Sequence, residues 1–201
     1  TGRFVPNPVA RRQIRQQFGI GDDTMLLGAV GRMSEQKRPL ELIRLLAGLM
    51  ARQPRVSFLF VGDGPLLGEA QALVQQLRLQ QRILFAGFRD TPWEYFAALD
   101  LHVLNSWTEG FGLATAEAMA CGVPALGTDV PGTRDILQGC PGGMLLAAGD
   151  DAEKLCQLEQ LLQDSPRLQR MAEQARPYVM HRFGKQQIES RILDFYQKVL
   201  E

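Results

Sequence analysis

The sequence predicts an α/β fold, a Rossmann-like, doubly wound parallel sheet of about six strands with helices on both faces. Short runs of continuous apolar residues, typical of strands buried on both faces, alternate along the chain with segments of helical periodicity. With 201 residues, of which 45% are hydrophobic, the chain is long enough to bury a core around such a sheet. Because ligands of doubly wound sheets bind beyond the carboxyl ends of the strands, the candidate site residues are those that follow each apolar run.

The elements follow in order along the chain. The segment Phe4-Val5-Pro6-Asn7-Pro8 is typical of a stiff linker that leads into a helix, with Asn7 as the N-cap and Pro8 as the first helical residue. We expect this helix to end near Phe18-Gly19. The expected strands are 25–30, 56–61, 83–86, 101–104, 123–126 and 144–146. The expected helices after the first are 38–52, 66–79, 92–98 and 112–120. The pattern is helical from 150 to the end, and the last helix is amphipathic, with an apolar face of Ile188, Ile192, Phe195, Tyr196 and Val199.

Composition and charge exclude several classes of protein. The chain has 22 basic and 22 acidic side chains, and a formal net charge of zero argues against broad electrostatic binding to nucleic acid or to an anionic membrane. Cys121, Cys140 and Cys156 are odd in number and lack Cys-x-x-Cys spacing, so we expect reduced thiols, without a disulfide framework or a zinc site. No apolar run approaches the roughly 20 residues that span a bilayer, and no charged-then-apolar leader opens the chain. We therefore expect a cytoplasmic location.

The strongest cluster of candidate residues is Glu109-Gly110-Phe111-Gly112-Leu113-Ala114-Thr115-Ala116-Glu117, between an expected strand and an expected helix. Gly110 and Gly112 let the backbone come close to a ligand, and the free N–H groups at the start of the helix favour an anion such as phosphate. Glu109 and Glu117 can accept hydrogen bonds from the hydroxyls of a sugar or ribose. The alternative interpretation is a capping acid and a solvent-exposed helix glutamate.

A second cluster, Gly31-Arg32-Met33-Ser34-Glu35-Gln36-Lys37-Arg38, follows the first expected strand. The planar guanidinium of Arg32 and the compact ammonium of Lys37 both suit phosphate oxygens. A solvated basic loop is the alternative, but the position at the carboxyl end of a strand favours a site.

A third cluster, Gly62-Asp63-Gly64-Pro65-Leu66-Leu67-Gly68, has glycine spacing similar to that of a dinucleotide-binding turn and lies between a strand and a helix. It follows the second strand instead of the first. The dinucleotide-binding motif also requires an acidic residue at the end of the next strand, about 20 residues later, and this sequence has none there. We interpret it as a tight strand-to-helix turn. An NAD(P)-binding oxidoreductase domain remains an alternative on this pattern.

The histidines do not predict a catalytic group. His102 lies in an expected strand and should be packed, and His181 lies in the helical tail and should be on the surface. Neither has a Ser, Cys or Asp partner at the spacing of a triad, and no set of ligands has metal spacing. Trp93 and Trp107 border loops at the expected ligand-binding edge, where they either pack in the core or stack on a base or sugar.

Together these motifs resemble a known family. Glu109-x7-Glu117, with Phe111-Gly112-Leu113 inside it and Glu117-Ala118-Met119-Ala120-Cys121-Gly122-Val123-Pro124 at its end, resembles the signature of the retaining family 4 glycosyltransferases. Gly31-Arg32…Lys37, Val61-Gly62-Asp63-Gly64-Pro65 and Phe85-Ala86-Gly87-Phe88 occur in the order that this family shows. The resemblance covers nearly the whole chain.

The resemblance implies one half of a GT-B fold, in which two Rossmann-like domains face each other across a cleft. Residues 1–201 resemble the carboxyl-terminal domain, which binds the nucleotide sugar. Residues 1–8 resemble the interdomain linker, so the chain would be an excised part of a longer protein. Residues 184–201 resemble the terminal helix that packs toward an amino-terminal acceptor domain.

The implied activity is transfer of a hexosyl group from a nucleoside-diphosphate sugar, such as UDP- or GDP-hexose, to a glycan, lipid or other acceptor. Polysaccharide or lipopolysaccharide biosynthesis is the implied setting. Contact with the inner face of the membrane would come only through the amino-terminal domain. The isolated chain would be inactive.

The same resemblance implies roles for particular residues. Arg32, Lys37 and the helix start at Gly112-Leu113 would hold the diphosphate and stabilise the leaving group without a metal or cofactor. Glu109 would face hydroxyls of the donor sugar, and Arg32, Lys37 and Glu109 are the implied catalytic residues. Glu117 would bind the ribose hydroxyls, and the backbone near Phe88-Arg89 would meet the base. The full implied donor-binding set is Gly31, Arg32, Lys37, Phe88, Arg89, Glu109, Gly110, Phe111, Gly112, Leu113, Thr115 and Glu117.

The sequence departs from the family pattern in two places. Arg38 follows Lys37 where the family usually has glycine, which could alter the loop. Pro131-Gly132-Thr133-Arg134-Asp135 stands where the family often shows two glycines and a glutamate, so no role is carried over to it. Besides the oxidoreductase, the alternatives are a sugar-nucleotide epimerase of the same fold and a non-catalytic domain that senses a nucleotide sugar.

Overall fold

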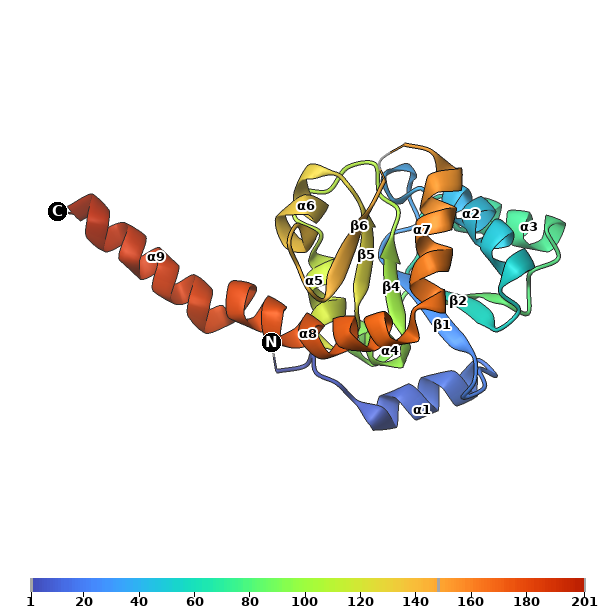
Figure 1. Cartoon of the computed structure of the whole chain (residues 1–201), viewed down its shortest axis with the longest axis horizontal. Helices are drawn as coiled ribbons and strands as arrows, with labels where there is room; N and C mark the ends of the chain where they lie inside the picture. The colour runs from blue at the N-terminus through green and yellow to red at the C-terminus, as the bar shows by residue number, and fades with distance from the viewer. Residues whose placement is uncertain (1, 148, 201) are drawn as a thin grey trace.

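The computed structural model describes residues 2–147 and 149–200, and it confirms the predicted fold class (Figure 1). Six strands form one sheet, in the order β3-β2-β1-β4-β5-β6, and its neighbouring strands pair in parallel. The strands are β1 (Met25–Val30), β2 (Val56–Val61), β3 (Ile83–Gly87), β4 (Leu101–Leu104), β5 (Ala125–Thr128) and β6 (Gly143–Leu146). This is the order of dinucleotide-binding sheets, in which the direction of winding reverses between β1 and β4 and leaves a crevice at their carboxyl ends.

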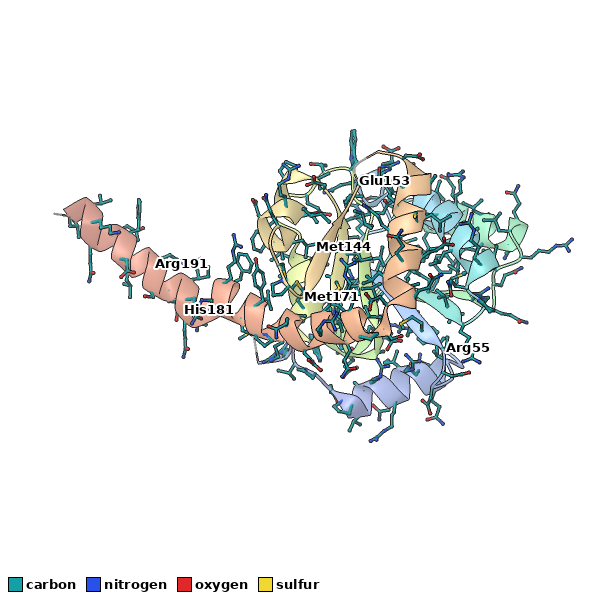
Figure 2. The ribbon with its side chains drawn as sticks, viewed as in Figure 1. Arg55, Met144, Glu153, Met171, His181 and Arg191 are labelled. Atoms are coloured by element: carbon teal, nitrogen blue, oxygen red, sulfur yellow. The ribbon has the colours of Figure 1, made fainter. Side chains whose placement is uncertain are left out.

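Helices cover both faces of the sheet. The helices are α1 (Pro8–Gln17), α2 (Pro39–Arg52), α3 (Leu67–Gln76), α4 (Pro92–Ala98), α5 (Leu113–Ala120), α6 (Pro131–Leu137), α7 (Asp151–Gln163), α8 (Ser165–Phe183) and α9 (Lys185–Leu200), with a 3-10 turn η1 (Glu35–Lys37). Core residues of α2, α3 and α7 pack with alternate strand residues such as Phe58, whereas those of α1, α4 and α5 pack with the intervening residues such as Leu59. Met171 of α8 is buried with the core residues of α2, α3 and α7, and Met144 of β6 packs against the same group (Figure 2).

The N-terminus of α1 forms as predicted. Asn7 Oδ1 accepts hydrogen bonds from the amides of Val9 (3.2 Å) and Ala10 (3.0 Å), and Pro8 is the first helical residue. Pro8, which we expected in the linker 1–8, thus belongs to α1, and Thr1 lies outside the described residues.

The fifth strand begins later than predicted. We expected 123–126, whereas β5 spans Ala125–Thr128. Gly122, with φ +81°, and the amide of Val123, which donates back to α5, form the turn that ends the helix. Pro124 has no N–H group to give to the ladder, so the strand starts after it.

Several helix ends also differ from the prediction. The third helix, expected at 66–79, is α3 at Leu67–Gln76, because Arg78 adopts a left-handed conformation with φ +57°. Helix α6 was not predicted, although its first residue, Pro131, is a common helix-start signal. The remaining differences are single residues: α2 begins at Pro39, α5 begins at Leu113, β3 includes Gly87 and β6 begins at Gly143.

Helix α9 projects from the body of the domain (Figure 1). None of its described residues is buried, and its apolar residues Ile192, Phe195, Tyr196 and Val199 are 49–64% exposed. Arg191 marks this helix in Figure 2, well away from the sheet. The predicted helix at 184–201 is thus present from Lys185, Gly184 caps α8, and Glu201 lies outside the described residues.

Candidate functional site

The sheet brings the two strongest candidate clusters together. β1 pairs with β4 through Leu27 with Leu101 and Gly28 with His102, so the loops that follow the two strands emerge side by side at the point where the winding reverses. One loop carries Arg32 and Lys37, and the other carries Glu109 to Gly112.

Three polar contacts join the two loops. Lys37 Nζ lies 2.5 Å from Glu109 Oε1, and the Glu109 side chain is only 7% exposed. Beside this ion pair, Gln36 Nε2 donates to the Thr108 carbonyl (2.9 Å), and the Trp107 amide donates to the Gln36 carbonyl (3.1 Å). Lys37 remains 24% exposed, so its ammonium group can still contact a ligand.

In the loop between β4 and α5, the space in front of Gly110 is open. No described heavy atom lies within 4 Å of a Cβ placed on Gly110. Gly112 has φ +80° and caps α5, whose first residue, Leu113, is 66% exposed. The amides of Thr115 and Ala116 donate to the Gly112 carbonyl, so those of Leu113 and Ala114, beside this exposed residue, are the helix-start N–H groups that suit an anion.

The turn after β2 is closed, although its glycines have the same spacing. A Cβ on Gly64 would lie 2.5 Å from the Met33 carbonyl oxygen, and a Cβ on Gly62 would clash with the Gly31 carbonyl. The backbone of 31–33 thus fills the space in front of these glycines, and the Met33 amide donates to the Asp63 carbonyl (2.9 Å). The interpretation as a tight strand-to-helix turn is confirmed.

The predicted base-binding residues border a hollow beside Arg32. The hollow has a volume of about 370 Å³ and is lined by Val30, Gly31, Arg32, Val61, Gly62, Asp63, Phe88 and Arg89. Phe88 is 73% exposed, so an aromatic face is open to a ligand there.

Glu117 faces a different hollow, of about 240 Å³, between α5, α8 and the segment before α1. Phe4, Phe111 and Phe183 contribute to its walls, and burial raises the pKa of the Glu117 carboxyl. The structure thus places Arg32 with Lys37, Lys37 with Glu109, and Arg32 with Phe88 and Arg89. Glu117 lies apart from these groups, in a hollow that it shares with the predicted residues Phe111 and Leu113. The side chain of Thr115 is fully buried behind the loop, so its hydroxyl does not reach the open surface.

The remaining candidates behave as packed or surface residues. His102 is fully buried, and burial, assisted by the charge of Lys37, lowers its pKa to about 3. His181 is on the surface of α8 (Figure 2). Trp93 packs edge-on against Phe4 with ring centroids 6.0 Å apart, which confirms the core interpretation for it, whereas Trp107 is 67% exposed.

The thiols are free, as expected. Cys121 and Cys140 are buried and Cys156 is exposed, and burial raises the pKa of Cys121 to about 12. Across 2–147 and 149–200, no three His, Cys, Asp or Glu side chains gather as metal ligands would. Nor does this part of the chain contain a helix long and apolar enough to cross a membrane.

Sequence reasoning missed two residues that shape the site. A Cβ on Gly132 would lie 2.5 Å from the Glu109 carbonyl oxygen, so this glycine lets the start of α6 support the open loop from behind. Gln36 joins the two loops through its side chain and its carbonyl. The signal for Gly132 was its place after Pro131 at a helix start, whereas nothing in the local sequence indicated the partners of Gln36.

Comparisons with known proteins agree with this geometry. A sequence model of the family described as glycosyl transferases group 1 matches residues 10–178. The N-acetyl-alpha-D-glucosaminyl L-malate synthase of Bacillus anthracis is 34% identical over 188 residues, which are 94% of this chain and 49% of that protein. The chain spans about half the length of the curated relatives that it matches.

Solved structures with a similar fold also include glycosyltransferase proteins. The Anabaena protein HepE, crystallised in complex with UDP and glucose, is 26% identical with a TM-score of 0.86, over 98% of this chain and 54% of that one. The carboxyl-terminal domain of a glycosyl transferase group 1 protein from Francisella tularensis is 24% identical with a TM-score of 0.79, over 92% of this chain and 97% of that one, which shows a shared fold.

Proposed function

The chain belongs to the glycosyl transferases group 1 family, and from this premise we propose that it is the carboxyl-terminal, donor-binding domain of a retaining family 4 glycosyltransferase. The parent protein would transfer a hexosyl group from a nucleoside-diphosphate sugar to an acceptor. The observation that carries the proposal is the meeting of Lys37, Glu109 and the open start of α5 where the winding of the sheet reverses.

The diphosphate would lie between the Arg32–Lys37 loop and the start of α5. An ammonium group has three donors, and one of those of Lys37 is directed at Glu109, so among the residues that the structure describes two are left for phosphate oxygens. Exposed Arg32 adds a planar donor fork on the same loop. When the bond between the sugar and the diphosphate breaks, these cations and the helix N-terminus would stabilise the charge on the leaving group.

The sugar and the nucleoside would lie on either side of the diphosphate. The carboxylate of Glu109 has one oxygen on Lys37, which leaves the other able to accept from a sugar hydroxyl. The exposed ring of Phe88 and the hollow beside Arg32 would receive the base. We retain Glu117 for the ribose hydroxyls; this assignment requires the ribose to reach the hollow beside the linker.

The rest of the enzyme would come from an amino-terminal acceptor domain. The exposed apolar face of α9 would pack against that domain, and residues before α1 would form the linker to it. The chain alone should not transfer sugar, because holding an acceptor near the anomeric carbon can supply about 7–11 kcal/mol in well-oriented systems.

Calorimetry on this chain tests the proposal. We expect weak binding of one nucleoside diphosphate among UDP, GDP and ADP, no binding of NAD, and the same affinity in EDTA, because Arg32 and Lys37 supply the positive charge. A large loss of affinity in EDTA would overturn the metal-independent site. Binding of NAD alone would favour the oxidoreductase, and multiple-turnover transfer by this chain alone would overturn its assignment as half of an enzyme.

A further inference from the structure

Gln36 makes two of the three polar contacts that join the loops at the site. Its side-chain amide donates to the Thr108 carbonyl (2.9 Å), and its own carbonyl accepts from the Trp107 amide (3.1 Å). The next residue, Lys37, forms the ion pair with Glu109. Residues 36–37 are therefore fixed to residues 107–109 in register.

The contacts between the two loops lie outside the paired part of the sheet. The paired residues of β1 and β4 are Leu27–Leu101 and Gly28–His102, well before either loop begins. Gln36 itself belongs to the three-residue turn η1, and 105–112 has no regular structure. The spacing between the loops therefore depends on the few contacts between them.

A bound donor would weaken one of these contacts. Under the proposed function, Lys37 shares its ammonium group with the diphosphate and Glu109 shares its carboxylate with the sugar. The two contacts of Gln36 use only an uncharged amide and backbone groups, so they persist when the ion pair is shared. Gln36 can thus hold Lys37 and Glu109 at a fixed separation in both states.

We propose that Gln36 is a positioning residue for the donor, which sets the separation between the cation that binds the diphosphate and the carboxylate that binds the sugar. This inference rests on the proposed function. Its consequence is selective: loss of the Gln36 side chain should weaken binding of an intact nucleotide sugar, which engages both loops, more than binding of the nucleotide alone.

The test compares two variants with a matched control. Gln36→Met removes the donor at similar length, whereas Gln36→Lys keeps a donor. Gln76→Met makes the same change at an exposed glutamine at the end of α3. Because Gln36 is exposed, its loss leaves no buried polar group unpaired and the variants should fold.

Two quantities are measured for each protein. The first is the ratio of the Kd values for UDP-glucose and UDP, and for GDP-mannose and GDP, by calorimetry. The second is the hydrogen-exchange rate of the Trp107 amide, which reports on opening between the loops without any ligand. We expect Gln36→Met to raise the Kd ratio about three- to tenfold and to speed exchange by a similar factor, as for loss of one hydrogen bond.

We expect Gln36→Lys to keep wild-type exchange at Trp107, because it retains a donor, and Gln76→Met to behave as wild type in both measurements. Wild-type exchange at Trp107 in Gln36→Met would overturn the role of the side chain, whether or not nucleotides bind. Faster exchange with an unchanged Kd ratio would overturn the link to the donor. If the wild-type chain binds none of the four nucleotides, the proposed function fails for UDP- and GDP-sugars, and the donor role of Gln36 falls with it.

Discussion

Two glycine turns of the same spacing lie at the same edge of this sheet, and they serve opposite purposes. Gly62 and Gly64 follow β2, and the backbone of 31–33 packs directly against them. Gly110 and Gly112 follow β4, and the space in front of Gly110 is open. In the first turn, glycine makes room for another part of the chain, and in the second the space in front of Gly110 stays open.

The difference comes from the neighbours of each turn. β2 is followed by a turn that meets the Gly31–Met33 loop, because β1 and β2 pair along six residues up to Val30 and Val61. β4 pairs with β1 over two residues, and its loop is supported from behind by Gly132. A glycine pattern alone therefore does not identify a ligand site.

The largest expected effect is on the closed turn. Gly62→Ala should lower the free energy of unfolding by about 3 kcal/mol or more, because its Cβ would overlap the Gly31 carbonyl at a φ of +139°. Gly110→Ala should change it by less than about 1 kcal/mol, since its Cβ meets open space. Urea unfolding of both variants measures this, and equal losses would contradict the contrast between the two turns.

The strands beneath the turns also differ in their response to pH. β2 has no ionisable side chain, whereas β4 contains His102, with its pKa lowered from 6.5 to about 3 by burial and by the charge of Lys37. Because the folded-state pKa lies below the unfolded one, the unfolded state binds the proton first. This contribution to stability is complete above pH 6.5 and is lost as the pH falls toward 3.

The slope approaches about 1.4 kcal/mol per pH unit well below pH 6.5, so about 2 kcal/mol is lost between pH 6.5 and 4.5. His102→Phe should lack this component. Urea unfolding of both proteins across that range measures the difference, and parallel pH profiles would show that His102 does not titrate with unfolding.

Nucleotide affinity should depend on residues near the open turn at Gly110. Lys37→Ala should weaken binding of the nucleoside diphosphate by about 1–3 kcal/mol, the range for a charge-assisted hydrogen bond, and Glu117→Ala should have an effect in the same range. Lys185→Ala, on exposed α9, is the control for the lysine. Calorimetry on the chain measures all three, and wild-type affinity in both Lys37→Ala and Glu117→Ala would reject the site assignment.

Glu109 should act at a different step. In the full-length enzyme, Glu109→Ala should mainly lower turnover, because its proposed contact is with the donor sugar. Steady-state kinetics with donor and acceptor would show this as a fall in kcat.

The smallest expected effect is at Arg38, between Lys37 and α2. This residue has φ +51° and ψ +53°, a left-handed conformation that costs a side chain about 1–2 kcal/mol. Arg38→Gly should therefore stabilise the fold by about 0.5 kcal/mol, after the greater freedom of glycine in the unfolded chain is counted. Arg38→Ala separates the backbone effect from loss of the weak Glu41 contact, and stabilisation by alanine would contradict the explanation.

Much of the fold was predictable from local patterns. The buried strands, the Asn7 cap and the positions of Arg32, Lys37 and Glu109 at strand ends all follow from apolar runs and helix-start signals. The start of β5 was missed because the pattern did not show that Gly122 to Pro124 form a turn. The family pattern did, however, flag Arg38 as a place where glycine is usual, and the structure gives it the backbone conformation that favours glycine.

The parts that could not be predicted depend on contacts distant in sequence. The Gly62 and Gly110 turns look alike until the backbone of 31–33 is placed against one of them. The contacts of Gln36 link residues about 70 positions apart, and the side chain of Thr115 proves to be buried. The contacts of Gln36 and the burial of Thr115 do not follow from a motif, because a motif specifies local conformation and does not specify which distant residues pack against it.

The most direct test is an amide chemical-shift titration of the ¹⁵N-labelled chain with UDP, GDP and ADP. We expect one of them to shift the amides of 110–113 and of 31–37 most strongly, because the ligand enters the open turn and the adjoining cationic loop. Shifts centred on 65–68, at the start of α3, with 110–113 unchanged would contradict it, since the ligand would then occupy the turn that the structure shows to be closed.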